Sequence, residues 1–211
     1  SVACDGCSGR GSVGRAWAAV GGGAGVAEIA PVTVGGRKAK VGVAMDEQPG
    51  TARPDKIPHL KPAFREGGTV TAANSSSISD GAAALVLANS SGLAAKGYNP
   101  RARVMGHASH AQAPGWFTTA PVPAARKLLD RLGWTVADVD LWEVNEAFAV
   151  VPMAFMHEME LSPDVVNVYG GACALGHPIG ASGARILVTL LNALERHDLK
   201  RGVAAICIGG G

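Results

Sequence analysis

Apolar and polar residues become regularly spaced after Gly67, where short apolar runs alternate with stretches of helical period. In the longest of these stretches, five apolar residues between Ile186 and Leu194 fall on one face, which predicts a buried amphipathic helix over 182–195. Further helices are predicted over 90–96, over 122–132 and from Asn145, and strands over 82–88, 102–108, 139–144, 165–169 and 203–208. Strands that alternate with helices predict an α/β fold built of sheet and helix layers.

The first 66 residues lack this regularity and divide into two predicted segments. Residues 1–27 contain eight glycines and keep neither period, so we predict little stable structure there. Our hypothesis is that these residues are a misread or truncated stretch of a longer gene. Several prolines in residues 28–66 break any long element, so only a short strand over 32–34 is predicted in this segment.

The composition argues against several classes of function. The 211 residues are 47% apolar and 17% charged with a net charge of +2, whereas a nucleic-acid-binding protein would carry a basic face. No apolar run approaches the ~18–20 residues that span a bilayer, so we expect no membrane association. Two of the four cysteines lie in apolar, strand-like contexts, which argues against a disulfide framework and favours a reducing, cytoplasmic location.

A glycine-rich block over 167–183 carries one histidine, His177, directly before the helix predicted over 182–195. Glycines let a substrate approach the backbone closely, and a helix start offers free N–H groups and a partial positive charge. Pro178 fixes the backbone next to His177, so the direction in which the imidazole leaves the chain is restricted. Because its pKa is near neutral, the imidazole can take a proton from a thiol, which indicates a catalytic base.

Two other blocks accompany it, namely Asn145-Glu146-Ala147-Phe148 and Cys207-Ile208-Gly209-Gly210-Gly211. Together the three blocks resemble the C-terminal domain of thiolases, the acetyl-CoA acetyltransferases, from about Glu28 to the last residue. The resemblance implies the C-terminal half of the layered thiolase fold over 67–211, a mixed sheet with helices that lacks its final strand. It also implies that residues 28–66 are a remnant of the loop domain that covers CoA, the alternative being a solvated loop.

The resemblance implies catalytic roles for four residues. His177 would activate the nucleophilic cysteine of the family. Cys207, at the carboxyl end of a predicted strand, would remove the α-proton of the second acyl-CoA and protonate the leaving CoA; the residues alone also allow an inert, packed thiol. The N–H of Gly209 would stabilise an oxyanion. Asn145 would hold a water of the oxyanion hole, and it is also predicted to cap the helix that begins at Glu146.

Contacts with the pantetheine of CoA are implied for four further residues: Ala72, Ser76, Ala147 and Phe148. The surrounding block over 68–82 reads by itself as a polar turn. It departs from the family pattern at several positions, with Ala73 and Ser77 standing where the family has glycines. Because both substitutions stiffen the turn, the contact through Ser76 is the weaker part of the resemblance.

The implied reaction is the thioester Claisen condensation of acetyl-CoA to acetoacetyl-CoA and its reverse, thiolysis. CoA thioesters and CoA are the substrates, and no metal or bound cofactor is required. The reaction proceeds through an acyl-enzyme on a cysteine. That cysteine belongs to a domain for which there is no room before Glu28. Cys7 matches its motif only superficially, and we expect no function for Cys4 or Cys7.

We therefore expect a thiolase fragment that is a poor enzyme by itself. The alternative is an inactive fragment that binds CoA weakly or associates with other subunits. A ketosynthase is a third option, but that class lacks a cysteine at the position of Cys207. The resemblance implies that the parent protein is a homo-oligomer, either a dimer or a tetramer.

Overall fold

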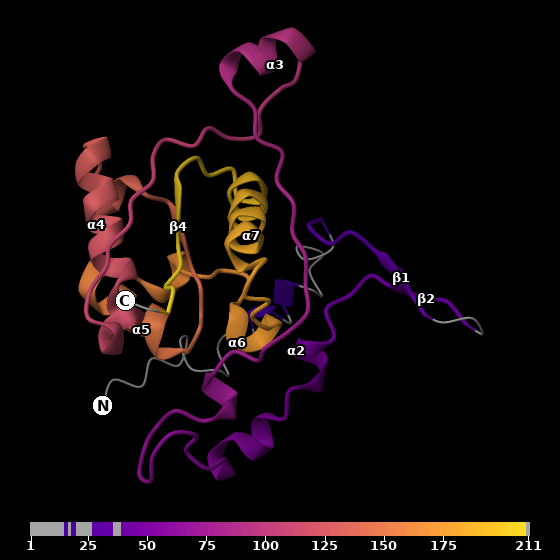
Figure 1. Ribbon diagram of the computed structural model, residues 1–211, viewed down its shortest axis with the longest axis vertical. Helices are drawn as coiled ribbons and strands as arrows, with labels where there is room; N and C mark the ends of the chain where they lie inside the picture. The colour runs from indigo at the N-terminus through magenta and orange to yellow at the C-terminus, as the bar shows by residue number, and fades with distance from the viewer. Residues whose placement is uncertain (1–14, 17, 20–26, 36–38, 210–211) are drawn as a thin grey trace.

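The computed structural model describes residues 15–16, 18–19, 27–35 and 39–209. Its centre is a parallel pair of strands, β3 (Leu141–Val144) and β4 (Gly202–Ala205). Helix α7 (Ser182–Arg196) packs on one face of this pair, and α4 (Pro121–Leu132) and α5 (Val150–Met159) lie on the other side (Figure 1). This arrangement confirms the predicted layered α/β fold.

The alternation of side chains along β3 explains how both helix layers are held, since all four of its residues are buried. Trp142 and Val144 belong to the apolar core shared with α4 and α5, where the Trp142 ring lies 5.4 Å from that of Phe155. Leu141 belongs to a second core with α7. A Cβ on Gly202 would lie 2.8 Å from the Leu190 side chain, so glycine at this position lets α7 approach β4.

Helical periodicity located the well-packed helices correctly. The helices predicted over 122–132 and 182–195 are α4 and α7, each with one additional residue at an end. Gly133 ends α4 in the left-handed conformation at φ +64°. The helix predicted over 90–96 is α3 (Ser90–Lys96), which begins at an Asn89 cap.

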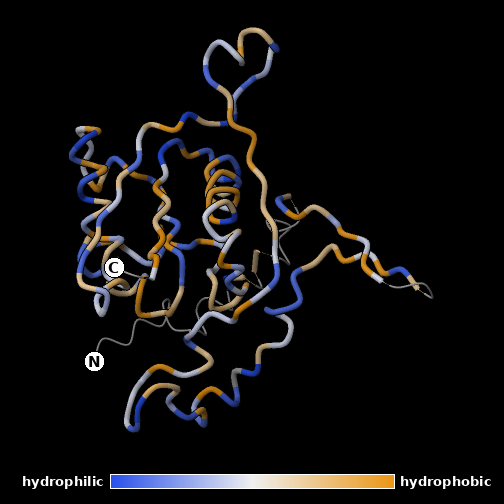
Figure 2. Tube along the Cα trace, in the orientation of Figure 1, coloured by the Kyte–Doolittle hydropathy of each residue, from blue (hydrophilic) through white to orange (hydrophobic). Residues whose placement is uncertain are grey.

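Three predicted strands were wrong. Residues 82–88 and 102–108 run as an excursion with α3 at its tip, and neither stretch forms a strand with any described residue (Figure 1). The first stretch is apolar, yet Val86 and Leu87 are 96% and 80% exposed (Figure 2). The stretch 165–169 makes only a single bridge between Val166 and Trp142, because Asn167 adopts a left-handed conformation at φ +48°.

The helix predicted from Asn145 begins only at Val150. The intervening loop is diverted toward residues 74–76, since Phe148 bridges to Ser75 and the N–H of Ala149 donates to the carbonyl of Asn74 at 2.9 Å. Asn145 therefore caps no helix, and that part of its predicted role was wrong.

The N-terminal part of the described chain contributes smaller elements. The predicted strand over 32–34 is β1 (Val32–Val34), which pairs antiparallel with β2 (Val41–Val43). Most of the predicted unstructured segment 1–27 lies outside the described residues, although Ala16 and Ala19 are helical and buried. The remaining short elements are α2 (Gln48–Thr51), α6 (Ala172–Leu175) and the 3-10 turns Pro54–His59, Ala72–Asn74, Pro114–Thr119, Val136–Asp138 and Pro163–Val165. In the part that the structure describes, no helix has the length and apolar character to cross a bilayer.

Replacing Phe155 by alanine should lower the free energy of unfolding by about 3–5 kcal/mol, because the fully buried ring leaves a cavity beside Trp142. Urea denaturation of both proteins measures the difference. Phe64→Ala is the matched control: its ring is 73% exposed, and its loss should cost about 1 kcal/mol or less. Equal losses in the two variants would contradict the assignment of the core.

Candidate active site

The carboxyl ends of β3 and β4 bring three of the predicted residues to the same edge of the sheet. Asn145 directly follows β3, and its N–H donates to the carbonyl of Ala205, the last residue of β4, at 2.9 Å. Cys207 lies two residues beyond Ala205 and is buried. Gly209 follows it and is exposed. This edge is where α/β folds hold their functional groups.

His177 lies on the turn between α6 and α7 and reaches Asn145. The Nδ2 of Asn145 is 3.5 Å from the Nε2 of His177. On the other side of the ring, Nδ1 is 2.5 Å from the hydroxyl oxygen of Ser182, the first residue of α7. The structure thus joins two of the predicted residues through the imidazole and adds Ser182, which the sequence analysis missed.

The contacts of Ser182 determine which nitrogen of His177 carries the proton. Its hydroxyl donates to the carbonyl of Pro178 at 3.0 Å. A hydroxyl has one hydrogen, so its oxygen accepts from Nδ1–H of the imidazole. Nε2 then carries the lone pair and accepts from the Nδ2–H of Asn145 at 3.5 Å. Burial, and secondly the positive charge of Arg185, lower the pKa of His177, so the ring is neutral at neutral pH and can accept a proton at Nε2.

Asn145 retains an unused acceptor. The residue is 1% exposed, and its Oδ1 is buried without a hydrogen-bond partner among the described residues. A buried amide oxygen is costly unless it is bonded, so this atom is suited to accept from a water molecule. The geometry is compatible with the water-holding role predicted for Asn145.

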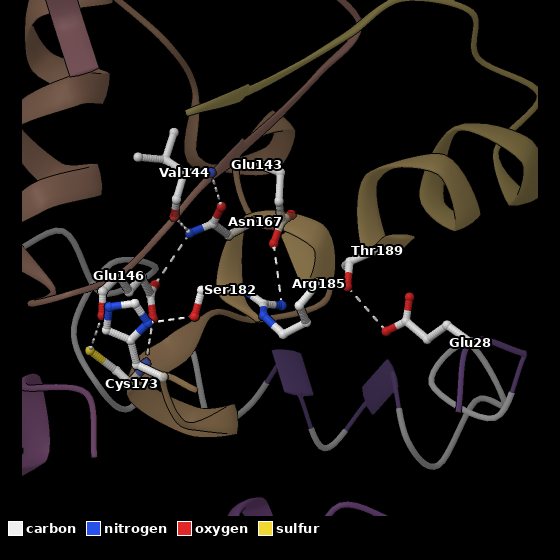
Figure 3. A network of polar contacts seen from close by, with 10 residues as sticks. Glu28, Glu143, Val144, Glu146, Asn167, Cys173, Ser182, Arg185 and Thr189 are labelled. Carbon is white, nitrogen blue, oxygen red and sulfur yellow. Dashed lines mark hydrogen bonds and ion pairs between the residues drawn. The ribbon is translucent and has the colours of Figure 1, made fainter. Parts of the chain in front are cut away.

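Asn167 and Glu146 hold the start of the loop 145–149 in place through hydrogen bonds. Neither residue was assigned a role from the sequence. The side-chain amide of Asn167 accepts from the N–H of Val144 at 2.7 Å and donates to its carbonyl at 2.8 Å (Figure 3). It also reaches Glu146 Oε1 at 3.5 Å. Glu146 Oε2 accepts from the N–H of Cys173 at 3.0 Å. The Glu146 carboxylate packs so closely on Gly171 that no Cβ would fit there.

Two of the residues predicted to contact CoA, Ala72 and Ser76, lie on a segment that is hydrogen-bonded to the loop 145–149 and to the turn that carries His177. The other two, Ala147 and Phe148, lie in that loop. The N–H and hydroxyl of Ser76 donate to the carbonyl of Ala147 at 3.1 and 2.9 Å, and Ser77 accepts from the N–H of His177 at 2.9 Å. Phe148 meets Phe64 edge to face at 5.8 Å. Because its hydrogen is used on Ala147, Ser76 offers a ligand only its oxygen.

Ala72, also predicted to contact CoA, is exposed at the start of the turn Ala72–Asn74. It belongs to the same segment as Ser76 but lies outside the bonded stretch that reaches Ala147 and His177. A contact between CoA and any of these residues remains a prediction.

The two thiols in the described residues are both held in the protonated form. Burial raises the pKa of Cys207. Burial and the negative charge of Glu146 raise the pKa of Cys173, whose sulfur lies 3.9 Å from the Glu146 carbonyl oxygen. A thiolate is the nucleophilic form of cysteine, so neither environment is that of an activated nucleophile. Cys4 and Cys7 lie outside the described residues.

Comparisons with known proteins agree with the fold and identify the family. The family model described as "Thiolase, C-terminal domain" matches residues 98–211, and "Thiolase, N-terminal domain" matches residues 11–91. The chain therefore belongs to the thiolase family. The second match begins upstream of Glu28, so the similarity extends beyond the C-terminal domain to which the motifs had pointed.

The chain is similar to several curated acetyltransferases. It is 46% identical to the acetyl-CoA acetyltransferase of Paracoccus denitrificans over 185 residues, covering 87% of this chain and 47% of the relative. For the Escherichia coli (strain K12) enzyme of the same name, the identity is 48% over 198 residues, covering 93% and 50%. The chain thus spans about half the length of these relatives.

Solved structures of thiolases are also similar to this chain. The Bacillus anthracis acetyl-CoA acetyltransferase superposes with a TM-score of 0.91 at 41% identity, covering 95% of this chain and 51% of the other. The Acat5 thiolase of Ascaris suum, solved in complex with coenzyme A, gives a TM-score of 0.84 at 42% identity with the same coverage.

The pH dependence of stability should reveal the buried carboxyl of Glu143, a β3 residue that is 2% exposed. Burial raises its pKa from 4.5 to about 8, against the opposing attraction of Arg185. The unfolded chain releases this proton near pH 4.5 and the folded chain only near pH 8, so this contribution to stability falls as the pH rises between them.

Urea midpoints at pH 5 and pH 9 test this, with Glu143→Gln removing the titrating group. We expect the wild type to lose more stability than the variant between these values. Glu158→Gln, at a half-exposed position, should behave as the wild type does. An equal pH dependence in all three proteins would contradict a buried, protonated Glu143.

Proposed function

We propose that this chain carries the acid/base part of an acetyl-CoA C-acetyltransferase site, for the thioester Claisen condensation of acetyl-CoA and the reverse thiolysis. The observation that carries the proposal is the His177 imidazole: Ser182 occupies Nδ1, and Nε2 is left as a base that faces Asn145. The family membership, the relatives' names and the position of Cys207 at the same sheet edge support it.

Proton transfers in the proposed reaction balance if Cys207 begins as a thiol. His177 Nε2 takes the proton of the nucleophilic cysteine, whose thiolate attacks the first acetyl-CoA. Cys207 gives its proton to the departing CoA and becomes a thiolate. That thiolate then takes the α-proton of the second acetyl-CoA, and the resulting carbanion attacks the acyl-enzyme. The bond between the acetyl group and the nucleophilic cysteine breaks, acetoacetyl-CoA leaves, and the cysteine thiolate recovers its proton from His177, so that both residues return to their starting forms. Burial keeps Cys207 protonated at rest, as the first transfer requires.

The developing oxyanions need hydrogen-bond donors. In the proposal, His177 and a water bound to Oδ1 of Asn145 stabilise one of them, and the N–H of Gly209 stabilises the other. Such preorganised donors contribute several kcal/mol of transition-state stabilisation each. Ser76, Ala147 and Phe148 would line the path of the pantetheine.

We also propose that no described thiol is the acyl-accepting nucleophile, so that the chain alone transfers protons but not acyl groups. Cys173 supports this, since its thiol is partly buried beside Glu146 and has a raised pKa. A cytoplasmic location and a homo-oligomeric parent protein remain predictions from the family resemblance.

Hydrogen–deuterium exchange at the methyl group of acetyl-CoA tests the acid/base site without a nucleophile. In D2O, the chain should exchange this methyl faster than buffer does, and the rate should rise with pH because the reactive thiolate of Cys207 forms only above its raised pKa. Cys207→Ala should abolish the exchange, and His177→Ala should slow it about 100-fold. Cys173→Ser is the matched control and should leave the rate unchanged. Mass spectrometry of the recovered thioester gives the rates.

Exchange that persists in Cys207→Ala would overturn the assignment of the acid/base residue. CoA binding without any exchange would favour the binding-only alternative. Thiolysis of acetoacetyl-CoA, followed by the loss of enolate absorbance, tests the second proposal. We expect no turnover by this chain, and turnover that is lost in Cys173→Ser would show that a described thiol is the nucleophile.

A further inference from the structure

A buried group of charges lies behind His177, between α7 and β3. Arg185 follows Ser182 by three residues on α7, so the two side chains leave the same face of the helix (Figure 3). The Nη1 of Arg185 lies 3.8 Å from the Oε1 of Glu143. This distance is too long for a direct hydrogen bond, and the contact lies at the first turn of the helix that holds the imidazole.

Glu143 connects this pair to the other side of the site. It stands two residues before Asn145 along β3, and residues at that spacing leave an extended chain on the same side. Two links therefore join the same two elements. Glu143 meets Arg185, and Asn145 meets Ser182 through the His177 ring. The first turn of α7 is thus fixed against β3 at two points.

Arg185 has few polar contacts for a buried guanidinium group. All three guanidinium nitrogens are buried, and none has a hydrogen-bond partner among the described residues. Oε1 of Glu143 and Oε2 of Glu28 are in the same condition. Buried polar groups are almost always bonded, and an unbonded one commonly indicates a functional constraint. The guanidinium charge is therefore held near the imidazole and is only partly compensated.

Three carboxyl groups surround Arg185, and each is protonated more readily than usual. Burial raises the pKa values of Glu28, Asp46 and Glu143 in spite of the attraction of Arg185. Each of these carboxyl groups therefore offsets the charge of Arg185 less than an ordinary carboxylate would, and that charge also acts on His177. The lowered pKa of His177, caused first by burial and then by Arg185, agrees with this.

We propose that Arg185 is a positioning residue for His177: held against Glu143 at the start of α7, its positive charge favours the neutral imidazole, whose Nδ1–H is bound by Ser182 and whose Nε2 remains directed at Asn145. The inference rests on the proposed acid/base role of His177. Arg185 acts through the imidazole and the helix and contacts neither substrate nor reacting atoms.

The test is an NMR titration of the His177 ring, whose resonance is assigned by its loss in His177→Ala. Arg185→Met keeps the length of the side chain but removes its charge, and the pKa of His177 should rise by about half a unit or more. Arg185→Lys keeps the charge and should retain most of the wild-type value. Arg196→Met makes the same change at the other end of α7 and should leave the pKa of His177 unchanged.

Two results would overturn the proposal. No rise in Arg185→Met would show that the charge does not act on the ring. An equal rise in Arg185→Met and Arg185→Lys would show general loosening of the helix, because only the charge distinguishes these variants. If Arg185→Met does not fold, as judged by its thermal transition, Arg185→Gln gives the same comparison with a polar side chain.

The titration requires no turnover, so it separates this inference from the proposed function. If the pKa of His177 shifts in Arg185→Met but the chain does not exchange the acetyl-CoA methyl, the effect of Arg185 on His177 is supported and the proposed reaction is rejected. Exchange that depends on His177, with an unshifted pKa in Arg185→Met, would support the reaction and reject the role of Arg185.

Discussion

The two hydrogen bonds between the Asn167 amide and the backbone of Val144 determine where the chain leaves the central strand. They satisfy the N–H and carbonyl of Val144 much as a neighbouring strand would, at the last residue of β3. Asn145 and Glu146 follow at once, so their side chains start from a fixed backbone. Two contacts depend on the direction in which the chain leaves β3: that of Asn145 with His177, and that of Glu146 with the N–H of Cys173.

The elements that sequence periodicity located are those whose partners lie within one packed core. Helices α4 and α7 combine an apolar face with a clear stop. All four residues of β3 are buried, and β4 is a short run without polar side chains. Residues 82–88 have an equally apolar sequence but form no strand, because a strand exists only when another pairs with it. Periodicity describes one segment at a time and contains no information about its partner.

Some residues of the candidate site could likewise be predicted from the sequence, and others could not. His177, Asn145 and Cys207 stand in distinctive motifs, so they could be proposed from the sequence. The residues that contact and orient them could not be proposed in this way. In the sequence, Ser182 is an ordinary residue at a helix start, and Arg185 is a polar residue on a helix face. Their importance comes from contacts with Nδ1 of the imidazole and with Glu143, which is 42 residues earlier in the chain. The capping role predicted for Asn145 failed because distant residues divert its loop.

The segment from Asn74 to Ser77 joins the two site loops mainly through its own backbone: the Asn74 and Ser77 carbonyls accept from Ala149 and His177, and the N–H of Ser76 donates to Ala147. Backbone groups are the same in every residue. Evolution can therefore vary the side chains here, as Ser77 in place of the family's glycine illustrates, without undoing these bonds. A change in the length of this segment would be different, because one inserted residue would shift the backbone groups that bond to one loop relative to those that bond to the other. We expect this stretch to drift in composition among homologues while its residue count stays constant.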